Sequence, residues 1–138
     1  MGLLKKVMFV DDDRMVNLVH KQLAEKTGLA DELLIYNSSE EAIFHLMKIT
    51  NAGEFPELIL VDINMPQIDG HEFAKRVKTL KGFDAERTML AFLTSSRELE
   101  DVVKADEEEV EYFYWKPLDK DTLKKVLKDG FEMEVEFD

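Results

Sequence analysis

The apolar residues of this chain fall into short blocks of two kinds that alternate along its length. Unbroken or nearly unbroken apolar blocks, which are typical of strands covered on both faces, occupy residues 7–10, 33–36, 58–61, 88–94 and 110–115. Apolar residues at helical spacing occur over residues 14–27, 39–50, 70–81, 97–106 and 120–129. This alternation predicts an α/β fold with a parallel sheet and helices on both faces, but it leaves the order of the strands open.

Four of these helices are preceded by a residue that can cap them. The four residues are Asp13, Ser38, Asp69 and Asp119. Gly28 is suited to end the first helix. The apolar positions of that helix are Met15, Leu18, Val19 and Leu23. Their spacing predicts an amphipathic helix.

The composition limits the classes of function. Acidic residues outnumber basic ones by 30 to 18, and the net charge of −12 argues against nucleic acid, whose phosphates attract basic surfaces. The absence of cysteine excludes disulfides and thiolate metal sites. There is no signal-peptide pattern and no apolar run of membrane-spanning length. We therefore expect one soluble, cytoplasmic domain over residues 1–138, with its core at about 5–129 and no membrane contact.

Polar residues stand where the predicted strands end. Asp11 and Asp12 follow the first strand, Asp62 follows the third, Thr94 ends the fourth and Lys116 follows the fifth. These residues should converge, because the carboxyl ends of parallel strands share one edge. Clustered carboxylates favour Mg²⁺, a lysine can hold a phosphoryl group, and an aspartate can attack phosphorus. The group indicates phosphoryl transfer to a carboxylate, although Asp62 alone would also suit a simple turn.

These residues resemble the receiver domains of two-component response regulators, including single-domain chemotaxis regulators. The resemblance extends from Lys6 to about Lys128. Its motifs are Asp11-Asp12-Asp13, Asp62-Ile63-Asn64-Met65-Pro66 with Asp69-Gly70, Leu93-Thr94-Ser95, and Lys116-Pro117. It implies a flavodoxin-like (βα)5 doubly wound parallel sheet with strand order 2-1-3-4-5.

The resemblance also implies roles for the site residues. Asp62 would accept the phosphoryl group, and Lys116, joined to Pro117 by a cis peptide bond, would contact the phosphoryl oxygens. Mg²⁺ would be held by Asp11, Asp12, Asp62 and the backbone carbonyl of Asn64. Within that set, Asp12 rather than Asp11 would be the direct ligand.

A second group of residues would connect the site to a response. Thr94 would swing toward the phosphoryl group, and Phe113 would follow it inward. Asn64 and Ser96 match the positions that tune the lifetime of the aspartyl phosphate. Asp13 matches a variable position, and we interpret it as a helix cap.

The partners that the resemblance implies are proteins. A sensor histidine kinase or histidine phosphotransfer protein would donate the phosphoryl group. A downstream protein would bind the fourth helix, the fifth strand and the fifth helix. We expect a monomer or weak homodimer that catalyses its own phosphorylation and dephosphorylation, and therefore acts as a switch rather than an enzyme.

Three other functions fit parts of the sequence. A phosphatase could use Asp62 as its nucleophile, but such enzymes commonly carry a second acidic residue where this chain has Asn64. A flavin-binding electron carrier needs a hydroxyl-rich loop after the first strand, where residues 11–13 would repel a phosphate. A degenerate receiver would bind partners without phosphorylation, which the complete set of site residues disfavours.

Two stretches depart from the receiver pattern. Residues 106–111 are mostly acidic where receivers usually have a glycine, and we interpret them as a solvated face. The alternatives are that they select a basic partner or disfavour self-association. Residues 130–138 alternate apolar and acidic side chains. That period of two predicts an extended tail that packs its apolar side on the domain or adds to a sheet edge of this or a neighbouring molecule, with a disordered terminus as the alternative.

Some side chains have no assigned role. His20, His45 and His71 share no ligand spacing, and we expect them on helix surfaces. Tyr112, Tyr114 and Trp115 are expected to pack in the core and across strands, with a partner-binding surface as the alternative.

Overall fold

The structure is a computed structural model that describes residues 1–95 and 112–137. Its strands are β1 (Leu4–Val10), β2 (Ala30–Tyr36), β3 (Leu58–Val61), β4 (Met89–Thr94) and β5 (Tyr112–Trp115). Its helices are α1 (Arg14–Thr27), α2 (Ser39–Met47), the 3-10 helix η1 (Ala52–Glu54), α3 (Gly70–Lys78) and α5 (Lys120–Phe131). The helix predicted over 97–106 and the acidic stretch 106–111 lie outside the described residues.

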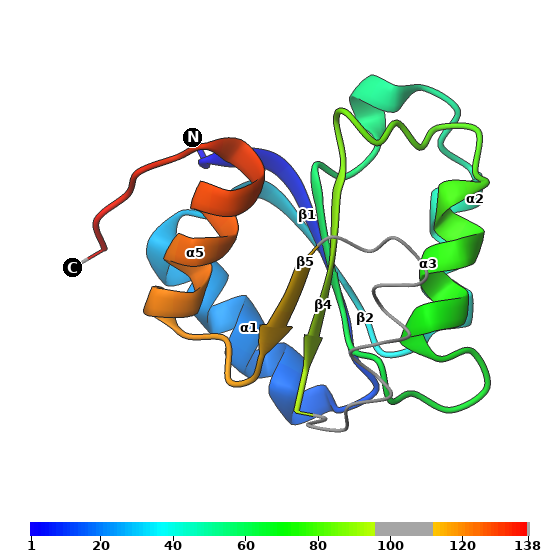
Figure 1. The fold of residues 1–138 in the computed structure, drawn as a ribbon, viewed down its shortest axis with the longest axis horizontal. Coiled ribbons are helices and arrows are strands. Elements are labelled where there is room, and N and C mark those ends of the chain that lie inside the picture. The colour runs from blue at the N-terminus through cyan, green and yellow to red at the C-terminus, as the bar shows by residue number, and fades with distance from the viewer. Residues whose placement is uncertain (96–111, 138) are drawn as a thin grey trace.

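The described strands form one parallel sheet in the order β2-β1-β3-β4-β5. Figure 1 shows α1 and α5 on one side of this sheet and α2 and α3 on the other. The doubly wound α/β fold and the strand order 2-1-3-4-5 are therefore confirmed.

The sheet separates two apolar clusters, and the central strand contributes to both. Ile59 and Val61 belong to one cluster, whereas Leu58 and Leu60 belong to the other. All four side chains are almost completely inaccessible to solvent. A central strand needs apolar residues on both faces, because successive side chains point to opposite sides of the sheet.

The predicted caps start their helices. The Asp13 carboxylate accepts hydrogen bonds from the backbone N–H of Met15 (2.9 Å) and Val16 (3.3 Å). Asp69, Ser38 and Asp119 likewise cap α3, α2 and α5. Gly28 ends α1 with φ of 65°, a left-handed conformation that glycine adopts without steric cost.

Several element boundaries differ from the sequence prediction. β1 begins at Leu4 and β2 at Ala30, because backbone pairing between these strands continues beyond their apolar blocks. α2 ends at Met47, where the N–H groups of Lys48 and Ile49 bond to carbonyls three positions back. α3 ends at Lys78 rather than near residue 81.

The first helix turns most of its apolar positions to solvent. Met15, Leu18 and Val19 are 68%, 47% and 52% exposed. The buried residues of α1 are Asn17, His20 and Ala24. The Asn17 side-chain amide donates to oxygens of Asp11, Tyr36 and Asn37, so this face of α1 contacts the ends of β1 and β2.

Two of the three histidines are core residues, so the expectation that they lie on helix surfaces is wrong. His20 packs against Phe9 with ring centroids 5.0 Å apart, and His71 packs against Phe92 at 5.1 Å. Each of these two residues is only 3% exposed. His45 is half-buried and forms a 2.8 Å hydrogen bond with the Tyr36 hydroxyl.

The end of the chain follows the first of the two predicted arrangements. α5 continues through Gly130 to Phe131, because Gly130 lets the helix approach Met89 where a Cβ would collide with the Met89 sulfur. Beyond the helix, Met133, Val135 and Phe137 pack against the apolar cluster that includes β1, β4 and α5 residues. Residues 132–137 form no strand, so the tail does not extend the sheet.

Candidate phosphoacceptor site

Five side chains meet at the carboxyl edge of the sheet, as the strand pattern predicted. Asp11 and Asp12 come directly after β1, and Asp62 comes directly after β3. The Asp62 N–H donates to the Val10 carbonyl (3.0 Å), which continues the β1–β3 pairing to the site. Thr94 is the last residue of β4, and Lys116 follows β5.

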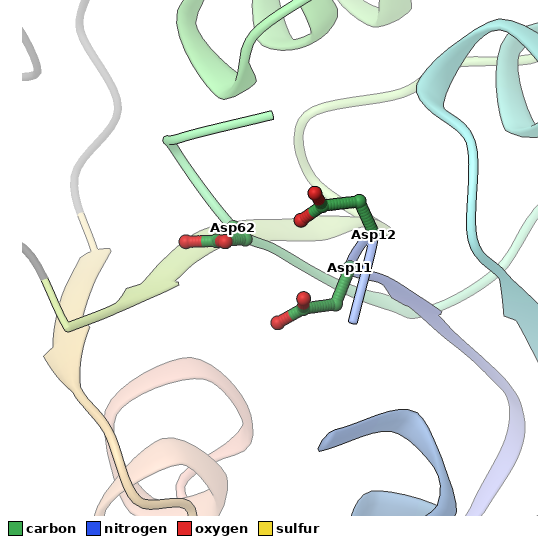
Figure 2. A group of neighbouring side chains, drawn as sticks. All are labelled: Asp11, Asp12 and Asp62. Carbon is green, nitrogen blue, oxygen red and sulfur yellow. The ribbon is translucent and has the colours of Figure 1, made fainter. Parts of the chain in front are cut away.

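The three carboxylates form one cluster. Each of Asp11, Asp12 and Asp62 offers an oxygen such that the three atoms lie within 4.8 Å of one another. Figure 2 shows the side chains pointing to the same side from the ends of their strands. Asp11 and Asp62 are 2% and 8% exposed, whereas Asp12 is exposed. The cluster therefore has two buried charges and one open side.

Lys116 places a positive charge in the site. Its ammonium lies 2.5 Å from Asp11 Oδ2 and 3.5 Å from Asp62 Oδ2. The Lys116 N–H donates to the Thr94 carbonyl (2.8 Å), which holds the chain beside the end of β4. The following peptide bond to Pro117 is cis. The predicted cis bond is confirmed, and one lysine bridges both buried carboxylates.

Burial raises the pKa of the Asp62 carboxyl above its ordinary value. The Lys116 charge and side-chain hydrogen bonds from Thr94 and Lys116 lower this pKa, whereas the Asp11 charge raises it, and the net direction is upward. Positive charge near Asp62 therefore favours the ionised carboxylate, which is the nucleophilic form.

The donor set fits a hard divalent cation. It consists of carboxylate oxygens, with two aspartates anchored in the sheet edge and Asp12 facing solvent. Mg²⁺ is typically bound through one or two carboxylates while keeping water and phosphate oxygens in its remaining positions. Asn64 is an exposed residue two positions after Asp62. The open side leaves room for the other ligands of such an ion.

The proposed switch residues lie next to one another in the sheet. Thr94 is completely buried, and it is paired in register with Trp115. Phe113 is half-buried, with its ring 6.3 Å from Phe92 and 5.0 Å from Trp115. Ser96 lies outside the described residues. Phe113 therefore occupies the strand beside Thr94.

Comparison with known families decides the assignment. A model of the response regulator receiver domain matches residues 7–128. The chain belongs to this family. Receiver domains typically bind Mg²⁺ at an acidic pocket, and they work with histidine kinases or phosphotransfer proteins.

Relatives of this receiver come from diverse organisms. Response regulator Rcp1 of Synechocystis is 27% identical over 134 residues, which cover 94% of this chain and 83% of Rcp1. Protein PilG of Pseudomonas aeruginosa is 28% identical over an alignment that covers 89% of this chain and 84% of PilG. A response regulator receiver protein from Dyadobacter fermentans has a similar structure, with a TM-score of 0.79, 28% identity, and coverage of 92% of this chain and 98% of that one.

Asn17 is a site-supporting residue that the sequence reasoning missed. Its side-chain amide donates to the Asp11 carbonyl (2.8 Å), the Tyr36 carbonyl (3.2 Å) and the Asn37 Oδ1 atom (2.6 Å). It thereby fixes the chain just after β1, where Asp11 and Asp12 begin. The available signal was a polar residue one turn into a helix that starts directly after the acidic cluster.

The buried His20 predicts a pH-dependent stability for this receiver. Burial lowers the pKa of His20 to about 4, the nearby Asp11 charge raises it, and the Lys116 charge lowers it. The folded pKa lies below the unfolded value of about 6.5, so the unfolded state takes up the proton first as pH falls. Burial of the neutral ring therefore costs no pH-dependent stability above pH ~6.5. The free energy of unfolding falls by roughly 3 kcal/mol as the pH falls to ~4.

Urea unfolding between pH 7.5 and 4.5, in EDTA, measures this dependence. The His20→Leu variant should lose less stability than the wild type across the window, whatever its stability at pH 7.5. Parallel curves for the two proteins would show that His20 does not contribute.

No helix in residues 1–95 or 112–137 is long and apolar enough to cross a membrane.

Proposed function

We propose that this receiver is a phosphorylation-dependent switch that accepts a phosphoryl group on Asp62 from a histidine kinase or histidine phosphotransfer protein. The observation that carries the proposal is the arrangement of Asp62 at the end of β3, beside Asp11 and Asp12 and 3.5 Å from the Lys116 ammonium. This arrangement joins a nucleophile, a cation and acidic groups suited to a metal ion in one place. Such a protein acts in the cytoplasm, as a monomer or weak homodimer.

The chemistry begins with the ionised Asp62 carboxylate. One of its oxygens attacks the phosphorus of a phosphohistidine, the P–N bond breaks, and its electron pair remains on the imidazole of the donor. Asp62 then carries an acyl phosphate. Asp11, Asp12, Asp62 and the backbone carbonyl of Asn64 would hold Mg²⁺, which when bound supplies positive charge opposite the carboxylates and phosphoryl oxygens.

Lys116 exchanges one anion for another during this step. In the structure its ammonium is shared between Asp11 and Asp62. Once Asp62 is phosphorylated, the phosphoryl oxygens become anionic partners of Lys116, which holds the product in place. The Thr94 hydroxyl, already hydrogen-bonded to Asp62, turns to a phosphoryl oxygen.

The signal leaves the site through β4 and β5. Movement of Thr94 frees space at the end of β4, and Phe113 on the neighbouring strand moves toward it. This changes the contacts that Phe113 makes with Phe92 and Trp115. A downstream protein reads the altered surface of the fourth helix, β5 and α5. Asn64 and Ser96 set the lifetime of the acyl phosphate.

The switch role is proposed over steady hydrolysis of phosphate esters. Asn64 is an amide at the position where aspartate phosphatases commonly carry a second acidic residue, so a dedicated general acid is missing there. Self-catalysed phosphorylation and slow loss of the phosphoryl group are then the chain's own chemistry.

An exposed apolar patch beside the site suits the phosphodonor. Met15, Leu18 and Val19 project from the first turns of α1, which starts directly after the acidic cluster. Large apolar side chains at this level of exposure are typical of interaction surfaces when they adjoin one another. A donor that brings its histidine to Asp62 would cover this patch.

Leu18→Glu is expected to separate the two kinds of donor. The charged side chain should slow phosphotransfer from a histidine phosphotransfer domain at least about tenfold, because it places a carboxylate in an apolar contact. Phosphorylation by acetyl phosphate should be unchanged, since a small donor does not touch α1. Phe44→Glu is the matched control, because Phe44 is 63% exposed on α2, on the other side of the sheet. Equal slowing of phosphotransfer by Leu18→Glu and Phe44→Glu would contradict the assignment of the α1 patch as the donor-binding surface.

The proposed function is tested by the intact mass of the protein after incubation with acetyl phosphate. A phosphoryl adduct should form with Mg²⁺ and be largely absent with EDTA. An unmodified wild type in Mg²⁺ would overturn the proposal in favour of partner binding without phosphorylation.

A further inference from the structure

The chain reverses direction at the end of α5. Glu132 has φ of 54°, and its N–H is bonded to carbonyls of the last helical turn. The Met133 N–H then donates to the Leu127 carbonyl (3.2 Å), so the chain is led back toward the helix. Figure 1 shows the red C-terminal segment leaving the end of α5 and descending on its outer side. We refer to residues 132–137 as the C-terminal segment.

Two ion pairs show that the C-terminal segment runs antiparallel to α5. Glu134 lies 3.4 Å from Lys128, and Glu136 lies 3.3 Å from Lys124. As the residue number rises along the segment, its ion-pair partner therefore lies nearer the N-terminus of the helix. Lys124 and Lys128 are four positions apart and lie on the same face of α5.

The side chains of the segment are divided between this face and solvent. Met133, Val135 and Phe137 are partly buried against the apolar cluster, whereas the glutamates between them are exposed. The face of α5 thus offers apolar surface and two ammonium groups at a spacing that an extended chain with alternating residues can meet.

The contact is a loose one. A cavity of about 270 Å³ remains between the segment and the helix, lined by Lys124, Lys128, Met133 and Val135 among others. The carboxylates of the ion pairs are 81% and 92% exposed, and pairs of this kind contribute little individually. The segment can therefore leave without opening the core.

The surface beneath the segment carries lysines, although the chain as a whole is acidic. The protein carries a net charge of −12, yet Lys124, Lys125 and Lys128 gather on one helix. This face also differs from the side of α5 that meets the sheet, where Tyr114 donates to the Asp129 carboxylate (2.6 Å). Lysines predominate on this strip, which also includes Asp121, and the acidic segment covers it.

We propose that the Lys124–Lys128 face of α5 is a docking surface for an extended partner segment with alternating apolar and acidic residues, and that residues 132–137 occupy it in cis as a competitor. The C-terminal segment resembles the proposed partner segment in its charge and in the spacing of its apolar residues. A partner gains access only when its own segment outcompetes the attached one, whose effective concentration is high because its tether is short.

A labelled peptide with the sequence of residues 131–137 serves as the probe. It should bind the chain truncated after Met133, which keeps the reversing turn, at least about tenfold more tightly than the full-length chain. Binding to the truncated chain should weaken as NaCl rises to about 0.5 M, because exposed ion pairs are screened. Equal binding to both chains, or none to the truncated chain, would overturn the proposal.

A charge reversal tests the same surface without a deletion. The full-length variant Glu134→Lys/Glu136→Lys should admit the peptide, whereas Glu132→Lys should not, because Glu132 takes part in neither ion pair. Lys124→Glu/Lys128→Glu in the truncated chain should abolish binding, and a peptide with lysines in place of its glutamates should restore it. Binding that ignores these charges would contradict the proposed ligand chemistry.

Sedimentation of the full-length chain tests whether the occupant is truly in cis. The monomer should keep the segment in place, as judged by its low affinity for the peptide. A dimer whose dissociation parallels the appearance of peptide binding would overturn the proposal, because the segment would then be exchanged between two copies.

Discussion

Asp62→Asn is expected to abolish phosphorylation by acetyl phosphate, with a loss of at least about a hundredfold in rate. An amide oxygen is a poor nucleophile, and none of the neighbouring carboxylates has the same position at the end of β3. The measurement is the fraction of protein that carries a phosphoryl adduct by intact mass, followed over time in Mg²⁺.

The matched control is Asp13→Asn. It makes the same chemical change in the acidic run next to the site, but the Asp13 carboxylate caps α1 and is not part of the cluster formed by Asp11, Asp12 and Asp62. Asparagine is as good a cap as aspartate, so the variant should fold and accept the phosphoryl group normally. Comparable loss in both variants would contradict the assignment of Asp62.

Asp62→Asn should also make the metal-free protein more stable at pH 7. Burial raises the pKa of Asp62, which means that the folded state disfavours its charge relative to the unfolded state. Replacing the carboxylate by a neutral amide removes that disadvantage. Urea unfolding in EDTA would show it, and a lower midpoint for Asp62→Asn would contradict this account of the site.

Lys116→Met is expected to have the second largest effect, on stability and on activity together. Methionine retains most of the aliphatic stem but leaves Asp11 and Asp62 buried without their shared cation. Breaking a buried charge arrangement in this way typically costs about 3 kcal/mol. Loss of one group that stabilises developing negative charge should slow phosphorylation about a hundredfold.

Added Mg²⁺ should restore much of the stability of Lys116→Met but little of its phosphorylation rate. The ion can neutralise the carboxylates, whereas the contact between Lys116 and the phosphoryl oxygens is lost. Lys21→Met, an exposed change on α1, is the control for loss of a positive charge. An unchanged unfolding free energy for Lys116→Met in EDTA would show that the lysine does not offset the two buried charges.

The site could be assembled from the sequence because each of its parts is encoded locally. Asp62 ends an unbroken aliphatic strand, and Asp11 and Asp12 end another, so parallel pairing alone brings them to one edge. Helix caps such as Asp13 can also be predicted from the sequence, because a cap depends on a hydrogen bond to a residue two or three positions away. Strand order came from the family resemblance and not from the pattern.

The orientation of α1 could not be predicted from its apolar positions. Its inner face depends on hydrogen bonds from Asn17 to residues 11, 36 and 37, which are distant in sequence or lie outside the helix. Burial of His20 and His71 depends in the same way on aromatic partners from other elements, Phe9 and Phe92. Periodicity reports which residues are apolar, and it does not report which polar residues the fold will satisfy internally.

The C-terminal segment shows a case where the pattern was informative and the boundary was not. Alternation predicted one packed side and one exposed side, and the burial of Met133, Val135 and Phe137 agrees with it. The alternating pattern places Gly130 at the start of the tail, yet it lies within α5, because its lack of a Cβ allows contact with Met89. A glycine selected by tertiary packing looks the same in sequence as one that ends a helix.

Borohydride reduction of the phosphorylated wild type tests the central claim most directly. An acyl phosphate on an aspartate is reduced to homoserine, and peptide mapping by tandem mass spectrometry then locates the modified residue. The account predicts homoserine at position 62 and aspartate at positions 11 and 12. Homoserine at another aspartate, or a phosphoryl adduct that resists borohydride, would contradict it.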